Sequence, residues 1–486
     1  MTNKQTEKKL ITKKSENISD WYTDVVLQSD LADYGPVRGT MILKPYGYAL
    51  WENVQKALDA MFKIDGVENA YFPMFIPMSL FNKEKSHIEG FSPELAVVTI
   101  GGGEQLSEPL AVRPTSEMIM YQEYAKWIHS WRDLPVKINQ WNNVVRWEKR
   151  TYLFLRTLEF LWQEGHCAHA THEESLEMVL KALDWYRQIY EDFYAIPVVL
   201  GVKSQSEKFA GADFTYTVEA IMPDGKALQA CTSHDLGQNF SKALNISFQD
   251  KNGVSQYVWQ NSWGFSTRSL GALFLTHGDD SGLVLPPRVA PIKVAIIPIF
   301  GKKDDQVLKY CEKIKQTLTN STSAYPGRIE IFDDFEKSFG WRVNEAELKG
   351  IPIKIAIGIR EVQEKIISYS FRLFDMDNKI SKFEDLPDRV EQFLSQIQNK
   401  MFENAKNVLR ANTHLVDNYE EFKERMLAGK GFLRSFWCED VGCEQKIKEE
   451  TKATTRCRFL NEKEDIGKCV YCGKSAKFRW YFAQAY

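Results

Sequence analysis

The segment GLVLPPRVAP, residues 282–291, divides this chain into two parts that follow different patterns. Its glycine and prolines interrupt helices and strands alike, so we place a domain boundary there. After this segment, the strand-like stretches VAIIPI, RIEIFDD and PIKIAIG alternate with helical stretches. Strands that alternate with helices predict a small α/β domain with parallel strand pairing.

The rest of the domain organisation follows from length and composition. A chain of 486 residues exceeds the usual size of one domain, so we expect several units. We expect a flexible Lys-rich tail over residues 1–19, a large domain over 20–288, the α/β domain over 289–400 and a cysteine-bearing domain over 401–486.

Charge and composition exclude several classes of function. The 62 basic and 65 acidic residues nearly balance, so the chain is not a polycation that binds nucleic acid indiscriminately, and we expect no DNA partner. No apolar run is long enough to span a bilayer, and the opening stretch contains no hydrophobic signal core. The 8 cysteines are too few and too unevenly spaced for a secreted disulfide framework. We therefore expect a cytoplasmic protein without membrane contact.

Several stretches of the large domain have clear periodicity. Residues 48–63 carry apolar side chains at helical spacing. A second helix is predicted after Thr171, because Thr171 and Glu174 form the S/T-x-x-E pattern of a capping box. Between these helices, residues 140–148 and 154–165 are strand-like, which predicts an antiparallel hairpin joined by the loop KRTYL.

Polar residues collect around this hairpin. AVRPTSE places two hydroxyls and the Glu117 carboxylate beside the rigid Pro114. Arg146 and Glu148 are predicted to alternate on one face of the first strand, since strand side chains repeat every second residue. An arginine on a rigid strand suits a bidentate clamp on a phosphate, although a cross-strand ion pair is the commoner role of an isolated R-x-E.

Two pairs of cysteines predict a metal site near residue 486. Cys438 and Cys443 form C-x4-C, and Cys469 and Cys472 form C-x2-C followed by glycine. Two such knuckles supply four thiolates for tetrahedral zinc, and a reducing cytosol disfavours the alternative of two disulfides. Cys457 lies between the pairs and is the alternate ligand.

The segment HCAHATH has a second metal-like pattern, with His166, Cys167, His169 and His172. Helical spacing would bring its histidines together. Thr171 is expected to cap a helix there, so His169 and His172 straddle a break in periodicity. We assign these residues a structural role.

Several motifs, taken in order, resemble those of the class II aminoacyl-tRNA synthetases and specifically the prolyl enzymes. They are RPTSE, VVRWE, FLRTLEFLWQEGH, KFAGADFTYTVEA, LQACTSHDLGQNF and NSWGFSTRSLGALFLTHGD. The resemblance implies an α+β catalytic domain on a mixed, mainly antiparallel sheet, then an α/β anticodon-binding domain and a small zinc-binding α+β C-terminal domain. It also implies activation of L-proline with ATP and transfer of proline to the 3′ end of tRNA(Pro), by a homodimer formed through residues 41–62.

The same resemblance assigns residues to a nucleotide site. Arg146 would hold the α-phosphate of ATP and Arg268 the outer phosphates or adenine, because attack on phosphorus needs fixed positive charge. Magnesium bridging the phosphates is expected. The remaining residues implied for ATP binding are Glu148, Arg156, Thr157, Gln229, Thr232 and Ser266.

Proline itself would be recognised beside the nucleotide. Its secondary ammonium calls for a carboxylate and a hydroxyl, which Glu117 and Thr115 provide by resemblance, and its compact ring calls for aromatic walls. Arg146 would also reach the proline carboxylate. The ring-facing family positions are Trp162, Phe209 and His234, and the catalytic set is Arg146, Arg268 and Glu117.

The later domains carry family positions too. Glu347 and Lys354 match the base-reading carboxylate and arginine that contact the tRNA anticodon. The cysteine pairs match a structural zinc site of related prolyl enzymes. Tyr486 matches a final tyrosine whose carboxylate approaches the active site.

The chain departs from the family pattern at four places. Ala230-Cys231 replaces Gly-Gly and Ala212 replaces a common glycine, so small side chains enter a site where backbone usually lies close to ligand. Cys231 is expected to be a packed, inert thiol. KRTYL is one residue shorter than usual and lacks its prolines. Lys354 replaces an arginine and Ala356 an acidic residue, and lysine has no planar fork for base recognition.

Two other interpretations are open at this stage. A threonyl enzyme shares the core and the anticodon domain, but is expected to hold catalytic zinc on Cys and His ligands that these motifs lack. A non-catalytic tRNA-binding paralogue tends to lose the phosphate clamps, which are present here as Arg146 and Arg268. The interval between WQEGH and NSWGF is too short for the editing insertion of many bacterial prolyl enzymes, so the chain resembles the archaeal and eukaryotic type.

Overall fold

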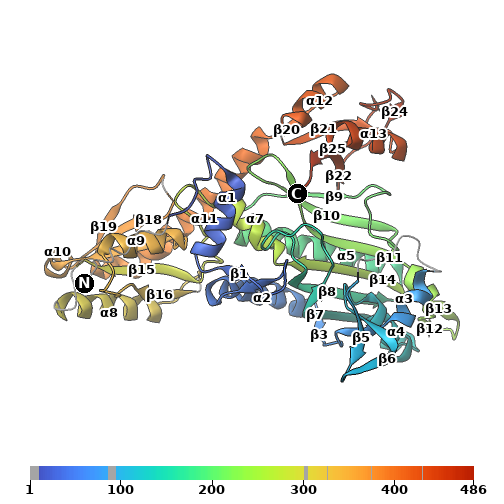
Figure 1. Ribbon diagram of the computed structural model, residues 1–486, viewed down its shortest axis with the longest axis horizontal. Coiled ribbons are helices and arrows are strands. Elements are labelled where there is room, and N and C mark those ends of the chain that lie inside the picture. The colour runs from blue at the N-terminus through green and yellow to red at the C-terminus, as the bar shows by residue number, and fades with distance from the viewer. Residues whose placement is uncertain (1–9, 86–94, 300–304, 326, 374, 430) are drawn as a thin grey trace.

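The computed structural model describes residues 10–85, 95–299, 305–325, 327–373, 375–429 and 431–486. Its centre is an eleven-stranded sheet in the order β20-β21-β25-β22-β9-β10-β11-β14-β8-β7-β3 (Figure 1). The strands are β3 Glu68–Asn69, β7 Val136–Val145, β8 Glu159–His169, β9 Val199–Val202, β10 Phe214–Ile221, β11 Ala227–Gly237, β14 Trp259–Ser266, β20 Thr413–Leu415, β21 Phe432–Trp437, β22 Ala453–Phe459 and β25 Phe478–Gln484. Only the outermost pairs, β3 with β7 and β20 with β21, are parallel, so the expected mixed, mainly antiparallel sheet is confirmed.

Two long helices, α2 (Pro45–Ile64) and α5 (His172–Gln188), cover one face of this sheet. Strand β14 explains why they pack there. Trp263 and the ring of Phe62 on α2 lie 5.0 Å apart, and Trp263 contacts α5 as well. Along β14, Ser262 and Ser266 alternate with Trp263 and Phe265 and therefore point to the other face. Thr171 caps α5 as predicted, because its Oγ1 accepts the Glu174 N–H at 3.2 Å.

The hairpin of β7 and β8 is confirmed, with Val136 opposite Ala168 and Val145 opposite Glu159. The predicted loop is wrong, because residues 146–158 all lie between the two strands. Tyr152 and Arg156 exchange backbone hydrogen bonds of 2.6 and 2.8 Å, and this local turn ends the ladder early. Residues 146 and 148 consequently follow β7 and do not alternate along it.

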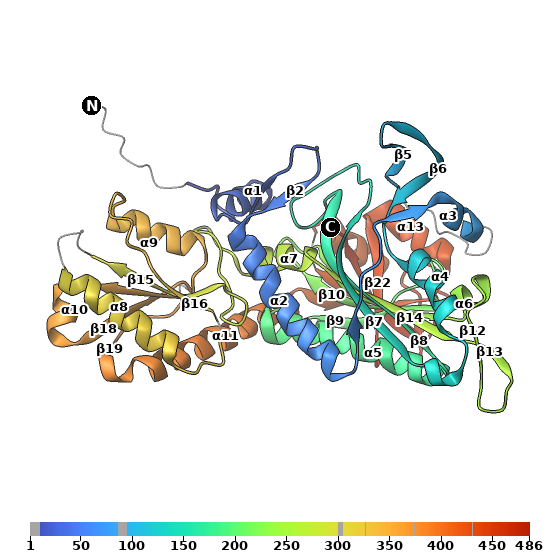
Figure 2. The ribbon, with the colours of Figure 1, turned by 90° about the horizontal axis from the view of Figure 1, so that it is seen from below.

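A second, five-stranded sheet lies beside the first, at the left of Figures 1 and 2, in the order β16-β15-β17-β18-β19. Its elements are β15 Ile292–Pro298, α8 Asp305–Asn320, β16 Arg328–Ile331, α9 Phe339–Leu348, β17 Ile353–Ile357, α10 Ile359–Glu364, β18 Ile366–Phe371, β19 Lys379–Lys382 and α11 Leu386–Ala411. The predicted parallel pairing holds for β16, β15 and β17 only. After β17 the chain turns back through the short α10, so β18 and β19 pair antiparallel.

The C-terminal strands extend the eleven-stranded sheet, a continuity that the sequence pattern did not predict. Strand β22 pairs with β9 through Arg458 opposite Val202 and Phe459 opposite Gly201. Gly201 permits this approach, since a Cβ there would lie 2.4 Å from the Arg458 carbonyl oxygen. The helices of this region are α12 Tyr419–Leu427 and α13 Val441–Thr451, and its small strands are β23 Gly467–Lys468 and β24 Ser475–Ala476.

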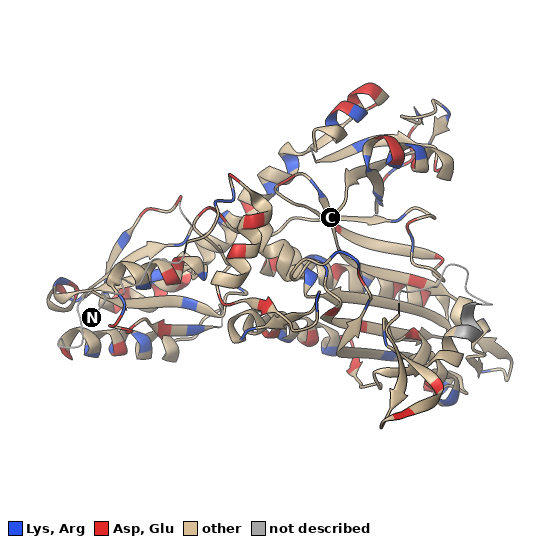
Figure 3. Ribbon diagram, viewed as in Figure 1, with Lys and Arg blue, Asp and Glu red and all other residues tan. Residues whose placement is uncertain are grey.

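The remaining elements surround the eleven-stranded sheet. They are α1 Ile18–Gln28, β1 Ala32–Tyr34, β2 Met41–Leu43, β4 Phe75–Pro77, α3 Met78–Lys85, β5 Val97–Gly101, β6 Glu104–Val112, α4 Glu117–Trp127, η1 Trp131–Asp133, η2 Ile189–Phe193, α6 Asn239–Ala243, β12 Ser247–Gln249, β13 Ser255–Tyr257, α7 Arg268–His277 and η3 Phe383–Asp385. Within the expected tail of residues 1–19, residues 1–9 lie outside the described part, and Lys14 bonds to two carbonyls at the end of α7. Acidic and basic residues intermingle over all regions (Figure 3). Among the described helices, none combines the length and apolar character needed to cross a bilayer.

Candidate active site

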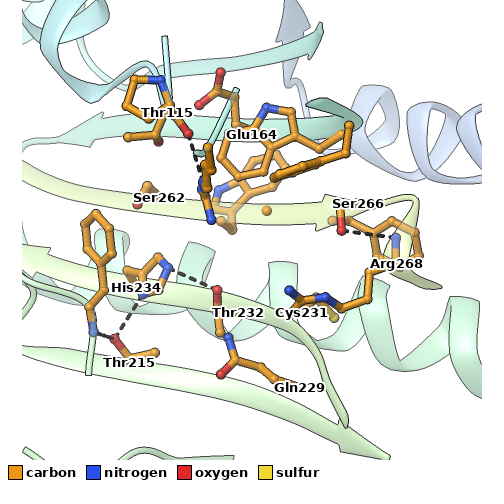
Figure 4. Close-up of a pocket in the computed structure, with 18 of the residues that line it drawn as sticks. Thr115, Glu164, Thr215, Gln229, Cys231, Thr232, His234, Ser262, Ser266 and Arg268 are labelled. Carbon is orange, nitrogen blue, oxygen red and sulfur yellow. Dashed lines mark hydrogen bonds between the residues drawn. The ribbon is translucent and has the colours of Figure 1, made fainter. Parts of the chain in front are cut away.

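A cleft of about 740 Å³ opens on the face of the eleven-stranded sheet that α2 and α5 leave uncovered. Its floor is formed by alternate residues of three neighbouring strands. In one row across the sheet, Glu164 lies opposite Gly264, which lies opposite Thr232. The next row contains His166, Ser262 and His234. Figure 4 shows Ser262 and Ser266 along β14, with Thr232 and His234 on the strand beside it.

The cleft brings together residues that lie far apart in the sequence. The predicted site residues that line it are Thr115, Glu117, Arg146, Glu148, Arg156, Trp162, Phe209, Gln229, Thr232, His234, Ser266 and Arg268. Thr157 is not among the lining residues. Its side chain is buried, and its Oγ1 donates to the Glu159 carbonyl at 2.7 Å.

Two further polar residues line the floor: Glu164, to which the sequence assigned no role, and His166, to which it assigned a structural one. Both are buried, and their polar atoms lie within 4.8 Å of each other and of the Glu117 carboxylate. The signal was present, because Trp162, Glu164 and His166 follow one another at every second position of a strand.

Glu117, Glu164 and His166 form the acidic end of the cleft. Burial raises the pKa of the Glu117 carboxyl, and Glu164 raises it further, while His166 opposes the shift. Burial also acts to raise the pKa of Glu164, but hydrogen bonds from His166, Ser116 and Asn142 outweigh burial and lower it. The pKa of His166 is raised despite its burial, because Glu164 and Glu117 stabilise its charged form. This end of the cleft therefore favours a bound cation.

Aromatic rings form the wall beside the acidic end. The rings of Phe209 and His234 lie 4.6 Å apart between centroids. His234 is held through both ring nitrogens, by Thr215 Oγ1 at 3.0 Å and Thr232 Oγ1 at 3.1 Å, as Figure 4 shows. Burial, together with the charges of His166 and Arg146, lowers the pKa of His234 to about 3. His234 is thus uncharged at neutral pH and suits an apolar ligand.

Arginines form the opposite, cationic end. The Arg146 guanidinium lies 5.2 Å from the centroid of the Trp162 ring, and its Nε donates to the Pro114 carbonyl at 3.1 Å. Arg268 is the first residue of α7, and its Nε donates to the Leu155 carbonyl at 2.9 Å. Burial and the nearby Arg146 and Arg156 lower the pKa of Arg268 to about 10. These cations repel one another, so a polyanion such as a triphosphate would stabilise them.

The floor also contains polar atoms whose hydrogen-bonding capacity is unused. Trp162 Nε1 and Ser262 Oγ are buried and have no hydrogen-bond partner among the described residues. Buried polar groups are normally paired, so these two atoms are available to hydrogen-bond a ligand in the cleft.

One departure from the family pattern, Ala230-Cys231, lies at an irregularity of β11. The pairing of β10 with β11 shifts so that Val218 faces Cys231 and Glu219 faces Gln229, which leaves Ala230 as the extra residue of a bulge. Cys231 is buried at the cleft floor, and its burial raises the pKa of the thiol well above the ordinary value. A protonated, packed thiol agrees with the expected inert role.

The C-terminal cysteines gather as the sequence predicts. The sulfurs of Cys438, Cys443, Cys469 and Cys472 lie within 4.8 Å of one another, and two of their separations are 3.7 Å. Zinc bonded to sulfur at about 2.3 Å in a tetrahedron requires sulfur separations of roughly 3.8 Å, so the donor set fits this ion. Cys457 is buried in β22, in a separate apolar cluster.

The HCAHATH residues do not form a site of their own. The helical spacing considered for them is wrong, because residues 166–169 belong to β8, where neighbours point to opposite faces. His172 Nε2 instead contacts Asp235 at 2.7 Å, and Cys167 is buried in the core.

The predicted anticodon residues lie on a helix and a strand of the domain built on the second sheet. Glu347 is near the end of α9, and its carboxylate accepts a hydrogen bond from Lys354 Nζ of β17 at 2.8 Å. Lys354 is buried, whereas Glu347 remains partly accessible.

Comparisons with known proteins place this arrangement in a class. The family model described as the tRNA synthetase class II core domain (G, H, P, S and T) matches residues 100–277, and the model of an anticodon binding domain matches residues 293–393. The fold and the cleft are therefore those of a class II aminoacyl-tRNA synthetase.

Comparisons over the whole chain narrow the assignment. A proline–tRNA ligase of Borreliella burgdorferi is 49% identical over 98% of this chain and 99% of its own, and one of Clostridium novyi is 47% identical over 100% of both. A crystal structure of the prolyl-tRNA synthetase from Cryptosporidium parvum, complexed with halofuginone and AMPPNP, superimposes with a TM-score of 0.93 at 39% identity, covering 100% of this chain and 99% of that one. The family model of the prolyl-tRNA synthetase C-terminal domain matches residues 419–486. The chain belongs to the prolyl-tRNA synthetase family, ligases that activate proline with ATP and charge tRNA with it.

Proposed function

We propose that the acidic end of the cleft binds the secondary ammonium of proline. The Glu117 carboxylate and the Thr115 hydroxyl would contact the ammonium, with Glu164 and His166 buried directly beside them. The apolar ring of proline would lie against Trp162, Phe209 and the uncharged His234. The single observation that carries this proposal is that one cleft joins a buried carboxylate pair and an arginine cluster through an aromatic wall.

The cationic end of the same cleft would hold ATP. Arg146 would neutralise charge on the α-phosphate as the proline carboxylate attacks it, and would steady that carboxylate as well. Arg268, with Arg156, would hold the outer phosphates or the adenine. The N-terminus of α7, where Arg268 lies, adds a favourable dipole. Other residues proposed for the nucleotide site are Glu148, Gln229, Thr232 and Ser266.

Magnesium accompanies ATP in this class and supplies charge neutralisation between phosphates. Glu148 is the cleft carboxylate nearest in sequence to Arg146, and we propose it as the protein ligand. Glu164 and His166 do not fit this role, because they are buried and engaged by Ser116, Asn142 and Tyr121.

The proposed residue roles are tested by ATP–pyrophosphate exchange across the amino acids. Proline is expected to stimulate exchange and threonine is not. Arg146→Ala should lower kcat by about 10²–10³-fold, because one preorganised contact to developing charge is lost. Arg132→Ala is the matched control, since Arg132 lies over the Trp131 ring outside the cleft. Equal activity of Arg146→Ala and wild type would refute the assignment.

The size of the proposed proline pocket predicts which wrong amino acids the enzyme would accept. Alanine and cysteine nearly fill a proline-sized pocket, so binding rejects each by only about 1–3 kcal/mol, or roughly 10- to 200-fold. We expect measurable mischarging of tRNA with alanine or cysteine that the enzyme itself does not clear. A sensitive aminoacylation assay that detects neither product contradicts this expectation.

We propose that Cys438, Cys443, Cys469 and Cys472 hold a structural zinc ion. Zinc content should fall in Cys438→Ser and persist in Cys457→Ser, because Cys457 lies outside the sulfur cluster. Metal analysis of the purified variants decides this, and equal zinc content in both would remove the site.

We further propose a cytoplasmic homodimer with domains over residues 20–288, 289–400 and 401–486. Ile42 on β2 is half exposed, and Tyr34, Val37 and Tyr48 near it are exposed as well, which supports an apolar interface there. Ile42→Glu should shift the mass measured by light scattering from dimer to monomer. An unchanged mass would show that the dimer interface lies elsewhere.

We also propose that Glu347 and Lys354 read the anticodon of tRNA(Pro).

A further inference from the structure

Arg372, directly after β18, joins the second sheet to the catalytic domain. Its guanidinium donates to both carboxylate oxygens of Asp279, with one distance of 2.8 Å. The Arg372 side chain is only 4% exposed, and that of Asp279 is 38% exposed. Planar bidentate pairs of this kind fix orientation as well as distance.

The other side of Arg372 contacts the proposed anticodon site. Its Nε donates to the backbone carbonyl of Glu347 at 2.8 Å. Glu347 in turn is paired with Lys354, and Lys354 lies opposite Ser370 on β18, two residues before Arg372. One guanidinium thus positions the residue that would read anticodon bases.

Asp279 lies at the end of the helix that carries Arg268. Its backbone carbonyl accepts the Trp21 indole N–H at 2.8 Å, and Lys14 donates to the Leu275 and Gly278 carbonyls at 2.6 Å each. Helix α7 then runs ten residues, about 15 Å, from this end to Arg268 in the cleft. Rigid secondary elements of this kind can carry coupling between distant sites.

We propose that Arg372 is a positioning residue that couples anticodon contact at Glu347 and Lys354 to the placement of α7, and hence of Arg268, during transfer of proline to tRNA. This proposal rests on the anticodon role proposed above. It requires no new contact between Arg372 and tRNA. Displacement of Glu347 by a base would reach Asp279 through one side chain.

The domain junction does not depend on Arg372 alone. Ser29 Oγ donates to the Leu348 carbonyl at 2.9 Å, and Tyr46 OH donates to the Lys349 carbonyl at 2.8 Å. These contacts keep α9 against the catalytic domain when the Arg372 pair is altered. A variant at Arg372 therefore tests positioning and not docking.

The test compares Arg372→Lys with Arg479→Lys. Both substitutions retain charge and remove the planar fork. Arg479 forms the same bidentate pair with an accessible Asp417, at 2.6 and 2.9 Å, but lies in the C-terminal domain. Asp279→Asn provides a second, partly exposed variant should Arg372→Lys fold poorly. Each protein is assayed for tRNA-independent exchange and for charging of tRNA(Pro) with its normal anticodon and with its anticodon bases replaced.

The expected result is specific to the normal tRNA. Arg372→Lys and Asp279→Asn should lower kcat/KM for the normal tRNA by about tenfold, a typical coupling, and leave exchange within about twofold of wild type. On the anticodon-replaced tRNA these variants should match wild type, because the coupling is already lost. Arg479→Lys should charge both tRNAs normally.

Other outcomes overturn the proposal. An equal loss on both tRNAs indicates general weakening of the junction, and no loss on the normal tRNA shows that the pair is passive. The failure of the underlying assignment looks different, since wild type itself would then charge both tRNAs equally.

Discussion

Glu219 and Glu117 are both buried against the catalytic sheet, at 0% and 3% exposure, yet the protein satisfies them differently. Glu219 accepts hydrogen bonds from Lys203 at 2.7 Å, from Arg456 at 2.8 and 2.9 Å, and from Thr217 at 2.9 Å. These cations outweigh the effect of burial and lower the pKa of Glu219. Burial instead dominates at Glu117 and raises the pKa of its carboxyl.

This comparison separates two uses of a buried charge. Side chains of the protein itself supply all the hydrogen bonds described for the Glu219 carboxylate. Its ion pair with Arg456 joins β10 to β22 of the C-terminal domain. Glu117 lines a cleft, and under the proposed function its ionised form would gain a full partner when the proline ammonium binds. The balance between burial and partners thus distinguishes a structural carboxylate from a ligand-binding one.

The largest expected effect is on stability at Glu219. Glu219→Ala should lower the free energy of unfolding by about 3–5 kcal/mol, because Lys203 and Arg456 are left buried without their counter-charge. Denaturant titration measures this loss. The control is Glu462→Ala, which removes the partner of the more accessible Arg434 and should cost less. Equal losses would mean that the buried group of Glu219, Lys203 and Arg456 contributes no more to stability than the accessible pair.

Activity should respond most at Glu117. Glu117→Gln should lower proline-dependent exchange by about 10²-fold, because a charged contact to the ammonium becomes a neutral one, with stability unchanged or slightly higher. Glu123→Gln, on the same helix but paired with Lys126, serves as the control. A fall in stability without a fall in exchange would reverse the roles assigned to the two carboxylates.

The two carboxylates should also give opposite pH dependence. The folded-state pKa of Glu219 is lowered, so its contribution to stability is present above about pH 4.3, the ordinary carboxyl value, and is lost as pH falls through the folded pKa. The folded-state pKa of Glu117 is raised, so wild type loses stability as pH rises from the ordinary value through the folded one. The unfolding free energies of Glu219→Gln and Glu117→Gln, compared with wild type between about pH 2 and pH 8, should therefore change in opposite directions with pH. Parallel curves would contradict the comparison.

The smallest expected effect is at Cys231, which is buried at the cleft floor. Cys231→Ala should change the KM for ATP by less than about threefold and cost about 1 kcal/mol of stability, because a packed neutral thiol loses only apolar contacts. Steady-state kinetics check this. A large rise in KM would show that the thiol itself contacts the nucleotide.

The resemblance to the prolyl enzymes predicted much of the site. The order of the motifs placed Arg146, Trp162, His234 and Arg268 around one cleft, and the strand period at Trp162 already contained Glu164 and His166. The path of residues 146–158 was not predictable, because backbone bonds between Tyr152 and Arg156 decide it and no side-chain period reports them.

Contacts between distant segments were the hardest to predict. The alternation of strands and helices after residue 291 indicated the second sheet, but the antiparallel return of β18 depends on the short α10. Arg456 pairs with Glu219 across 237 positions, and neither residue lies in a motif that indicates a partner. Such pairings follow from the packing of whole domains, which a single sequence does not display.

The continuous sheet has a consequence for how the chain is made. Strand β9 pairs on one side with β10, close in sequence, and on the other with β22, which the ribosome produces much later. Until then β9 is an open edge on a nearly finished catalytic sheet, and open edges invite pairing with other chains. Pairing of β22 with β9 therefore closes the edge at which a partly synthesised chain is expected to aggregate.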